Sequence, residues 1–527
     1  MTPEEWIAHD PDPKTAAELA ACGPDELAAR FARPLTFGTA GLRGPVRGGP
    51  DAMNVAVVSR ATWAVARVLT DRGLAGSPVI VGRDARHGSA VFATATAEVL
   101  AAEGFSVLLL PGPVPTPVVA FAVRNTGAAA GIQITASHNP PADNGYKVYL
   151  DNGIQIVSPT DRRIEAAMAN APLADQIARK PVEPARTDLV ERYSERAAGV
   201  RRATGSARVA LTALHGVGGA LAVETLRRAG FHDVHTVATQ FAPDPDFPTV
   251  AFPNPEEPGA TDALLALAAD VGADVAIALD PDADRCAVGI PTRTGWRMLS
   301  GDETGWLLGD YILSHRAAAA TPVVASSVVS SRMLAAIAVH YGAVHVETPT
   351  GFKWLVRADS NVPGGTLVYA YEEAIGHCVD PDAVRDKDGI SAAVLVCDLV
   401  AGLKTQRRSV PEVLDELARR YGVHEVAAVP RRVADADEAA ELMQRLQVDP
   451  PSRLAGFTAT TTDITDALIF TGGDDATAVR VVVRPSGTEP KLKCYVEVRC
   501  AVAGDLRAAR ERAAALRNEL VSTVQSW

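Results

Sequence analysis

The sequence predicts an α/β protein with three segments of similar build, followed by an α+β module. Short apolar strands alternate with amphipathic helices over most of the 527 residues, which is typical of a largely parallel sheet covered by helices. Each of the three segments carries a polar loop directly after a strand. Since ligands gather beyond the carboxyl ends of such strands, these loops are the first places to look for chemistry.

The first segment is expected to form a domain over residues 1–205. Residues 1–33 are rich in Ala and Glu and predict short helices. The next elements are expected as a helix over 60–70, a strand over 78–82, a helix over 89–103, and strands over 106–110 and 128–134. The last strand would deliver Ser137 into the loop beyond it.

Three further domains are expected over residues 206–320, 321–430 and 431–527. The second has strand patterns over 208–214 and 274–279 and a helix over 217–230. The third has strands over 322–326, 343–346 and 366–371 and a helix over 331–340. The fourth is α+β, with helices over 435–446 and 506–525 and strands over 458–462, 467–471, 478–483 and 493–498. Any repeat is architectural, because sequence identity between the segments is not evident.

Composition limits the classes of partner. The formal net charge is −12 and no basic block is present, which argues against nucleic acid. The six cysteines form no CxxC pair and no disulfide framework. The acidic start lacks a signal-peptide pattern, and no apolar run reaches the roughly 18 residues of a spanning helix. We therefore expect a cytoplasmic protein that acts on small molecules without membrane or nucleic-acid partners.

The most informative stretch is Thr135-Ala136-Ser137-His138-Asn139-Pro140. The prolines that follow hold Ser137 on a turn. Asn144-Gly145 predicts a second turn that places Lys147 at the start of the next strand. A serine beside His138, with a lysine ten residues later, suits a site where the serine carries a phosphoryl group and the lysine assists proton transfer or binds phosphate. A polar surface turn is the simpler alternative.

A triple aspartate follows the strand expected over 274–279. Asp280, Asp282 and Asp284 alternate in what we interpret as an extended loop, so their carboxylates would point the same way. Converging carboxylates repel one another unless a cation lies between them, and hard oxygen ligands suit Mg²⁺ with a phosphate oxygen completing the shell. Arg285 would then hold a phosphate or the serine loop. An exposed acidic turn is the alternative; an EF-hand lacks its helices and its terminal Glu.

Two glycine-bearing loops carry cations. The loop over 37–44 has three glycines and Arg43, which could reach a phosphoserine or a substrate. The loop over 484–493 is a plausible cradle for a dianionic phosphate, because it combines a guanidinium, hydroxyls, a glycine amide and lysines. Its candidate ligands are Arg484, Ser486, Gly487, Thr488 and Lys493. Ordinary surface turns would account for either loop.

The strand expected over 366–371 leads to Glu372-Glu373-Ala374-Ile375-Gly376-His377. Carboxylates suit vicinal sugar hydroxyls, and His377 is a candidate for proton transfer; an acidic helix N-terminus is the alternative. Other enzyme motifs are absent. The serine lacks a GxSxG elbow, no GxxxxGK[ST] loop is present, and Leu221 stands where a dinucleotide fingerprint at 216–221 needs glycine.

These five loops, in this order, resemble the α-D-phosphohexomutase superfamily of phosphoglucomutases and phosphomannomutases, from Phe37 to Lys493. The N-terminal extension and residues 373–376 look like the branch with animal phosphoglucomutase-2 and phosphopentomutase. The resemblance implies three similar α/β domains with mixed sheets and a C-terminal α+β domain around a central cleft. We expect a monomer or homodimer.

The resemblance assigns roles by position. Ser137 would be the phosphorylated serine and would hold Mg²⁺ with the three aspartates. Lys147 and Arg43 match residues that assist proton transfer and phosphate handling, with His138 beside them. Glu373 matches a sugar-hydroxyl ligand, Lys353 matches a substrate-contacting lysine, and the 484–488 loop matches a distal phosphate site. Ile375 stands where a serine often occurs, which leaves the role of His377 open.

The expected activity is that of an intramolecular phosphotransferase, an isomerase. It would interconvert hexose 1-phosphate and hexose 6-phosphate, with glucose or mannose as the sugar, through phosphoserine and a sugar bisphosphate that also serves as catalytic activator. Two alternatives stay open: a phosphopentomutase, and a transferase that makes glucose 1,6-bisphosphate from a high-energy donor. A non-catalytic phosphosugar-binding protein is disfavoured by Ser137 and the intact aspartates.

Overall fold

The computed structural model describes every residue except 38–40, 317–319, 434–435, 466 and 486–490. The chain forms two compact units. Unit 1 comprises Met1–Gly301, Gly351–Arg357 and Val368–Thr405, and unit 2 comprises Asp302–Thr350, Ala358–Leu367 and Gln406–Trp527. The chain therefore passes from unit 2 to unit 1 within strand β14 (Gly365–Glu372).

The first sheet of unit 1 is mixed. Its order is β1-β5-β4-β2-β3, with β6 beside β5; β2 is parallel to β3 and β4, whereas β5 is antiparallel to β4 and β1. The strands are β1 (Leu42–Pro45), β2 (Pro78–Arg83), β3 (Ser106–Leu109), β4 (Ala130–Ile134), β5 (Asp143–Leu150) and β6 (Ile154–Gln155). Three of these strands, β2, β3 and β4, agree with the sequence prediction.

Helices cover this sheet, and three short helices precede it at the N-terminus. They are α1 (Pro3–Ala8), α2 (Pro13–Ala20), α3 (Pro24–Ala32), α4 (Val55–Asp71), α5 (Ser89–Ala102), α6 (Thr116–Thr126), α7 (Thr160–Ala169) and α8 (Leu189–Ala198), with short 3₁₀ turns η1 (Asp151–Gly153) and η2 (Ala174–Gln176). The short leading helices, α4 and α5 confirm the predictions. Helix α4 begins where the Asn54 side chain accepts a hydrogen bond from the Val57 amide.

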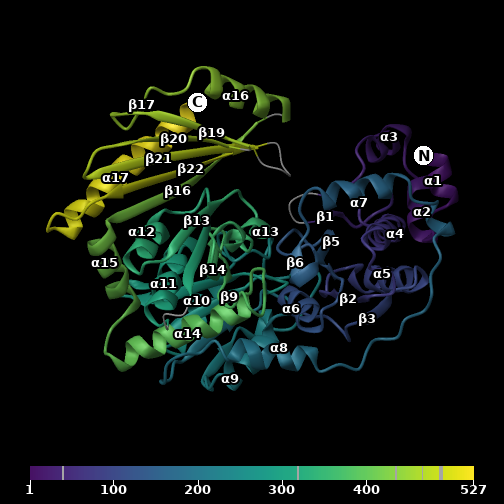
Figure 1. The fold of residues 1–527 in the computed structure, drawn as a ribbon, viewed down its shortest axis with the longest axis horizontal. Coiled ribbons are helices and arrows are strands. Elements are labelled where there is room, and N and C mark those ends of the chain that lie inside the picture. The colour runs from purple at the N-terminus through teal and green to yellow at the C-terminus, as the bar shows by residue number, and fades with distance from the viewer. Residues whose placement is uncertain (38–40, 317–319, 434–435, 466, 486–490) are drawn as a thin grey trace. The chain divides into compact units, whose positions relative to one another are not determined.

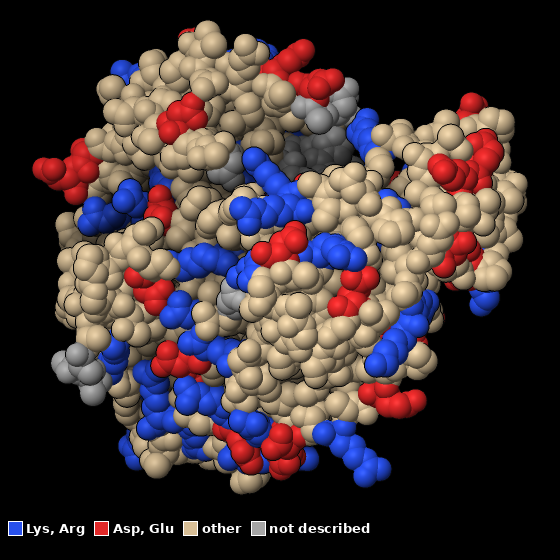
Figure 2. Space-filling model, turned by 45° about the vertical axis from the view of Figure 1, so that its right-hand side comes forward, with Lys and Arg blue, Asp and Glu red and all other residues tan. Residues whose placement is uncertain are grey.

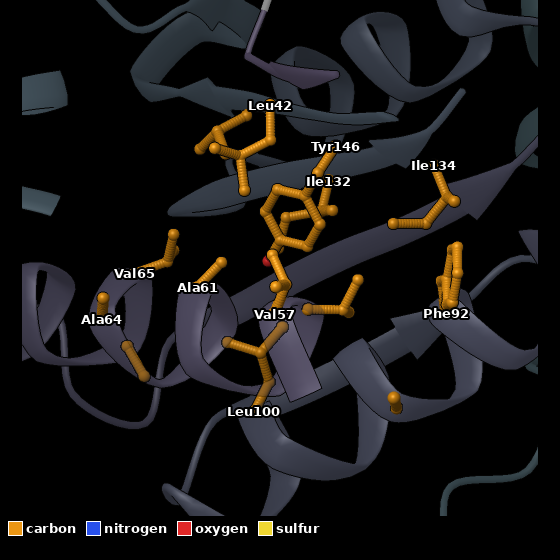
Figure 3. Packing of buried hydrophobic residues seen from close by; sticks show 14 of the residues in the cluster. Leu42, Val57, Ala61, Ala64, Val65, Phe92, Leu100, Ile132, Ile134 and Tyr146 are labelled. Carbon is orange, nitrogen blue, oxygen red and sulfur yellow. The ribbon is translucent and has the colours of Figure 1, made fainter. Parts of the chain in front are cut away.

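Figure 3 shows how the core of this part of the fold is packed. Side chains from α4 and α5 point toward the strands, and the ring of Tyr146 from β5 lies among them. The Tyr146 hydroxyl is satisfied inside the core, because it lies 2.9 Å from Thr62 Oγ1. The neighbouring residue Lys147 is thereby fixed on the opposite face of β5 from this core.

The second sheet of unit 1 has the order β11-β10-β9-β7-β8, with β7, β8 and β9 parallel and β10 antiparallel to both neighbours. Its strands are β7 (Val209–Thr212), β8 (Val234–Thr236), β9 (Val275–Leu279), β10 (Cys286–Thr292) and β11 (Gly295–Met298). The helices that accompany it are α9 (Gly219–Arg228), η3 (Ala238–Gln240), α10 (Asp262–Asp270) and α14 (Gly389–Thr405), and unit 1 also includes α13 (Phe352–Leu355). Strand β9 is fully buried and leads directly to Asp280.

Unit 2 contains the C-terminal module. Its sheet is antiparallel in the order β16-β22-β21-β20-β19, and α17 lies along one face (Figure 1). These elements are β16 (Val423–Arg432), α16 (Ala436–Val448), β17 (Arg453–Leu454), β18 (Phe457–Thr458), β19 (Thr460–Ile464), β20 (Ala467–Gly473), β21 (Thr477–Pro485), β22 (Lys491–Cys500) and α17 (Leu506–Ser526). This module confirms the α+β prediction.

The remainder of unit 2 is of α/β type. Strands β12 (Thr321–Ser327) and β13 (Val344–Thr348) are parallel and are joined through α12 (Met333–His340). The other elements are α11 (Gly301–Ser314), η4 (Ala358–Asn361) and α15 (Val410–Tyr421). Mixed sheets with covering helices and a C-terminal α+β module thus confirm the predicted fold class.

One local prediction is wrong. Asn144 and Gly145 form no turn; they lie inside β5, opposite Gly44 and Arg43 of β1. The Asn144 side chain explains the difference, because its amide donates to His87 O and Ser89 Oγ instead of closing a local turn. Lys147 therefore stands in the middle of a strand and not at its start.

The surface carries charges of both signs. Figure 2 shows Lys and Arg side chains among Asp and Glu on the visible face; the whole chain has 51 Lys and Arg and 63 Asp and Glu. Among the described residues, no single helix is long and apolar enough to cross a membrane. One pair of helices with a bend between them has the length and composition of a membrane span, which by themselves are weak evidence for one.

Candidate active site

The Ser137 turn is held in a strained conformation. Ser137 follows β4, is 1% exposed and has φ 54°, a left-handed value that costs a non-glycine residue energy. Its amide donates to Thr135 Oγ1 at 2.9 Å. The predicted turn is thus present, and the surrounding structure, not the residue's own preference, fixes the direction of the serine hydroxyl.

Arg86 is the main support of this turn, and the sequence analysis did not single it out. Its guanidinium donates to four carbonyl oxygens of the loop, at 2.7 Å to Ser137 O, 2.5 Å to Asn139 O, 2.7 Å to Pro140 O and 3.1 Å to Asp143 O. Arg86 is 4% exposed, and its Nε lies 3.5 Å from Asp84 Oδ2. The signal for it was the pair Asp84 and Arg86 directly after β2, the kind of polar loop seen after other strands.

A turn brings the three carboxylates of the aspartate loop together, so the loop is not extended as predicted. Ala283 has φ 54°, and its amide donates to Asp280 O at 2.9 Å, so the chain reverses between the carboxylates. One ligand oxygen from each of Asp280, Asp282 and Asp284 lies within 4.8 Å of the others. The convergence that was expected from alternation therefore exists, but a left-handed residue produces it.

The serine and aspartate loops meet in unit 1. Ser137 Oγ donates to Asp280 Oδ2 at 2.8 Å. Thr116, at the start of α6, fixes the second carboxylate: its hydroxyl donates to Asp282 Oδ2 at 2.5 Å and its amide to Asp282 O at 2.9 Å. Thr116 was also missed, because a threonine that opens a helix has no distinctive pattern.

Two buried lysines balance the carboxylates. Lys147 Nζ donates to Asp282 Oδ2 at 2.7 Å and to Asp284 Oδ2 at 2.9 Å. Burial alone would lower the pKa of Lys147, but the two carboxylates more than offset it and raise that pKa. Lys387 Nζ, which the sequence analysis did not name, lies 3.4 Å from Asp284 Oδ2 and 3.5 Å from Asp386 Oδ1. Both lysines are therefore cations at neutral pH.

The carboxylates themselves fit a hard cation. Burial, with Asp282 and Asp284 beside it, raises the pKa of Asp280 well above its usual value. Asp282 Oδ1 and Asp284 Oδ1 are buried and have no hydrogen-bond partner. Unsatisfied buried carboxylate oxygens are costly, and a divalent ion such as Mg²⁺ would satisfy them with the oxygen ligands it prefers.

Arg43 and His138 lie beside the serine. Arg43 Nη1 donates to Asn139 Oδ1 at 3.2 Å, and its Nε is buried without a partner. His138 Nδ1 lies 3.2 Å from Ser137 Oγ. Burial, together with Arg285 and Arg43, lowers the pKa of His138 well below its usual value, so the ring is neutral at physiological pH.

Arg285 connects the aspartate loop to the hairpin that contains Ile375 and Gly376. Its amide donates to Asp280 Oδ1 at 3.0 Å, and its guanidinium lies 3.7 to 3.9 Å from carboxylates of Glu256, Asp284 and Glu372. Arg285 also forms an isolated β-bridge with Gly376. Next to it, the Cys286 amide donates to Ile375 O at 3.0 Å. The aspartate loop and the predicted sugar loop are therefore hydrogen-bonded to each other.

The predicted sugar loop is the turn between β14 and β15 (Gly376–Cys378), not a helix N-terminus. Glu373 is half-buried at this turn. The backbone is tightly packed here, because a Cβ on Gly301 would lie 1.9 Å from Glu373 O. Lys353, in α13, is 8% exposed, and burial lowers its pKa. Glu373 and Lys353 both belong to unit 1, as does Ser137.

His377 differs from the other candidates. Its ring is 0% exposed and is stacked with Tyr369 and Tyr371, and its Nδ1 lies 3.0 Å from the Tyr369 hydroxyl. Burial lowers its pKa to about 3. The structure thus places His377 inside the hairpin core, with its Nε2 buried and without a hydrogen-bond partner among the described residues, and its role at the site stays a prediction.

The residues predicted to form a second phosphate site belong to unit 2. Arg484 and Lys493 face each other on β21 and β22. Ser486, Gly487 and Thr488 lie outside the described residues. The pairing of this site with Ser137 therefore stays a prediction.

Four family models match the chain in succession. They describe phosphoglucomutase/phosphomannomutase α/β/α domain I over residues 34–174, domain II over 191–293 and domain III over 300–421, and the C-terminal domain over 428–514. The fold and these matches define a phosphosugar mutase, an isomerase. The chain belongs to the phosphoglucomutase/phosphomannomutase family of the α-D-phosphohexomutase superfamily.

Individual relatives carry several names. A Haemophilus influenzae protein called "Probable phosphomannomutase" is 40% identical over 467 residues, covering 85% of this chain and 93% of the relative. Human phosphopentomutase is 33% identical, covering 99% and 94%. Among solved structures, a phosphoglucomutase/phosphomannomutase family protein from Burkholderia thailandensis superposes with a TM-score of 0.71 at 20% identity, covering 92% of this chain and 97% of that one. That likeness supports the fold alone.

Proposed function

We propose that the enzyme interconverts hexose 1-phosphate and hexose 6-phosphate, with glucose or mannose as the sugar. The observation that carries this proposal is the hydrogen bond from Ser137 Oγ to Asp280, inside a buried triad of carboxylates. The serine would carry the phosphoryl group between the two positions of the sugar. A sugar 1,6-bisphosphate would be the intermediate and the catalytic activator.

The residues around the serine have distinct tasks in this proposal. Asp280, Asp282 and Asp284 would hold Mg²⁺ together with a phosphoserine oxygen, and the ion would neutralise charge on the transferred group. Lys147 is already poised 2.7 Å from Asp282, so its ammonium lies beside the group in transfer and can bind it or move a proton.

Arg43 and His138 would act on the same group. Arg43 has a buried Nε without a partner, which suits a donor that waits for phosphate. The neutral His138 ring lies within hydrogen-bond reach of Ser137 Oγ and can accept or share its proton. Both residues would therefore assist the transfer of the phosphoryl group to and from Ser137.

Recognition of the sugar would fall to other loops. Glu373 would accept hydrogen bonds from sugar hydroxyls, Lys353 and Arg285 would contact the substrate, and Arg484 with Ser486, Gly487, Thr488 and Lys493 would hold the second phosphate. His377, whose buried Nε2 has no hydrogen-bond partner among the described residues, stays a candidate for contact with the substrate or for proton transfer. A monomer or homodimer in the cytoplasm stays the expectation for the whole protein.

Two other activities have specific support. The relatives that extend over nearly the whole chain include human phosphopentomutase, which favours a pentose 1-phosphate as the second candidate. Human glucose 1,6-bisphosphate synthase is 32% identical, covering 94% of this chain and 89% of the relative, which supports the transferase alternative. A stoichiometric requirement for a high-energy donor would distinguish the transferase from a mutase.

The direct test combines two measurements. A panel of glucose, mannose, glucosamine, ribose and deoxyribose 1-phosphates, compared by kcat/KM, ranks the sugars. Intact-mass spectrometry after incubation with glucose 1,6-bisphosphate shows whether the chain is phosphorylated. Ser137→Ala should abolish both the mass increase and turnover while the protein stays folded. Substantial turnover in Ser137→Ala would refute the phosphoserine mechanism, and a preference for ribose would replace the hexose assignment.

A further inference from the structure

A second charged cavity lies wholly within unit 2. It has a volume of about 270 Å³ and lies between the start of α12 and one end of the C-terminal sheet. Its charged lining residues are Arg332, His424, Arg480, Glu497 and Arg499. The volume is near the lower limit of small-molecule sites, so it suits one small ligand.

Positive charge predominates in this cavity, with three arginines against one carboxylate. In the described part of the chain, the exposed guanidinium of Arg332 makes no hydrogen bond or ion pair. Arg499 uses its Nε to donate to Tyr421 O at 3.2 Å, and no other bond of its guanidinium occurs among the described residues. Arg480 is paired instead, with Val328 O at 2.7 Å and with Glu347 Oε2 at 3.1 Å.

The single lining carboxylate is already occupied. Glu497 Oε1 accepts from Ser331 Oγ at 2.7 Å, from the Arg332 amide at 2.8 Å and lies 2.8 Å from His424 Nδ1. These contacts tie the start of α12 to β22 and β16. Among the described residues, no hydrogen bond or ion pair joins the Glu497 carboxylate to the guanidinium of Arg332 or Arg499.

His424 supplies the independent sign of a ligand. Its side chain is only 4% exposed, yet its Nε2 is buried and has no hydrogen-bond partner. A buried polar nitrogen without a partner is costly, and a ligand atom in the cavity would satisfy it. Because the Glu497 carboxylate accepts from Nδ1–H, Nε2 is the nitrogen that remains: it donates to an anion when the ring is protonated and accepts from a ligand hydroxyl when the ring is neutral.

The cavity is separate from the Arg484 phosphate loop. On the C-terminal sheet, His424 pairs with Arg499, which in turn pairs with Ala478 at the start of β21. Arg484 lies near the other end of β21, opposite Lys493. Arg480 and Arg484 are four residues apart, about 13 Å along an extended strand. The two cationic sites therefore lie toward opposite ends of one sheet.

We propose that this cavity binds a small anion that carries phosphate or carboxylate groups. Arg332 and Arg499 would donate ionic hydrogen bonds to the anion, and His424 Nε2 would complete its contacts. Because the ligand would contact both α12 and the strands β16 and β22, it would join the C-terminal sheet to the α/β part of the same unit. Its role would not be catalytic, since none of the residues proposed to act on the sugar lines the cavity.

The test uses the full-length enzyme with nitrogen-15-labelled histidine. The His424 resonances are assigned by comparison with His424→Gln, and inorganic phosphate and citrate are titrated separately while the Nε2 shift is followed. We expect a saturable shift with at least one probe. Saturation by phosphate alone identifies a phosphorylated ligand class, and saturation by citrate alone identifies a polycarboxylate.

Matched variants make the result specific. Arg332→Gln and Arg499→Gln should each raise the dissociation constant roughly tenfold or more, because each removes an ionic hydrogen bond to the anion. Arg507→Gln removes the same charge from an exposed position on α17 and should leave the constant unchanged. Arg332→Gln is informative even if Arg499→Gln fails to fold, since Arg332 is exposed. The proposal is overturned if His424 shows no saturable shift with either probe, or if Arg332→Gln binds as tightly as Arg507→Gln.

Discussion

Replacing Arg86 by lysine tests whether a residue outside the serine turn maintains the conformation of that turn. The arginine donates to four carbonyl oxygens of the turn, at 2.5 to 3.1 Å. A lysine ammonium is a single point with three donors and cannot span these acceptors, so we expect it to retain two at most. Two buried carbonyls would then lose an ionic partner, at about 1.5 kcal/mol each, for a total near 3 kcal/mol.

The catalytic effect should be larger than the loss of stability alone explains. Ser137 has a left-handed backbone that only its surroundings maintain. A displacement of the reacting group by about 1 Å can reduce a rate by roughly a hundredfold. We therefore expect Arg86→Lys to lower kcat for glucose 1-phosphate by about that factor, and to slow the phosphorylation of Ser137 by glucose 1,6-bisphosphate.

Arg60 offers a matched control in the same unit. It is also buried and donates to three carbonyl oxygens, at 2.9 Å to Ala171 O, 2.6 Å to Pro172 O and 2.9 Å to Met168 O, none of them in the serine loop. Arg60→Lys should cost similar stability in denaturant unfolding while kcat stays within about twofold of the parent. If kcat falls equally in both variants, Arg86 stabilises the fold without positioning the serine, and the reasoning is refuted.

Three further predictions concern the metal site and two buried titratable groups. Mg²⁺ at about 100 times its dissociation constant should stabilise the parent by about 2.7 kcal/mol in thermal unfolding, and Asp282→Asn should remove most of this gain; EDTA should stop turnover. The pKa of His377 is about 3 in the folded chain, against roughly 6.5 when unfolded, so stability should fall as pH drops below 6.5, by about 2 kcal/mol at pH 5. Unfolding titrations of His377→Phe should show a shallower pH slope between pH 5 and 7. Tyr193 donates to Asp388 Oδ1 at 2.7 Å, and burial raises the pKa of that acid to about 6. Tyr193→Phe should therefore cost about 1–3 kcal/mol at pH 8, where the carboxylate is ionised, and less at pH 5.

Residues whose chemistry is indicated by the sequence immediately around them could be predicted. Ser137 before two prolines and three aspartates after an apolar strand were found because the residue types and their order are specific. Arg86, Thr116 and Lys387 were missed, since each acts on a loop distant in sequence. Only the folded chain shows that Thr116 meets Asp282, 166 positions away.

Local patterns misled where a side chain found a distant partner. Asn144-Gly145 is a common turn pair, yet Asn144 donates to His87 and Ser89 and stays in a strand. The alternating aspartates suggested an extended loop, but Ala283 turns the chain back. The sequence also could not show that the ring of His377 is stacked with Tyr369 and Tyr371. Sequence thus located the loops better than it located the side chains within them.

The backbone bonds between the aspartate loop and the 373–376 turn have a consequence for the evolution of substrate choice. Arg285 is bridged to Gly376, and Cys286 donates to Ile375, so the residues expected to select the sugar share a scaffold with those expected to carry out transfer. A substitution in this turn that admits a new sugar is therefore expected to shift the backbone next to Asp284 as well. We therefore expect that exchanging the sugar specificity of this scaffold requires changes in both loops together and not in one residue alone.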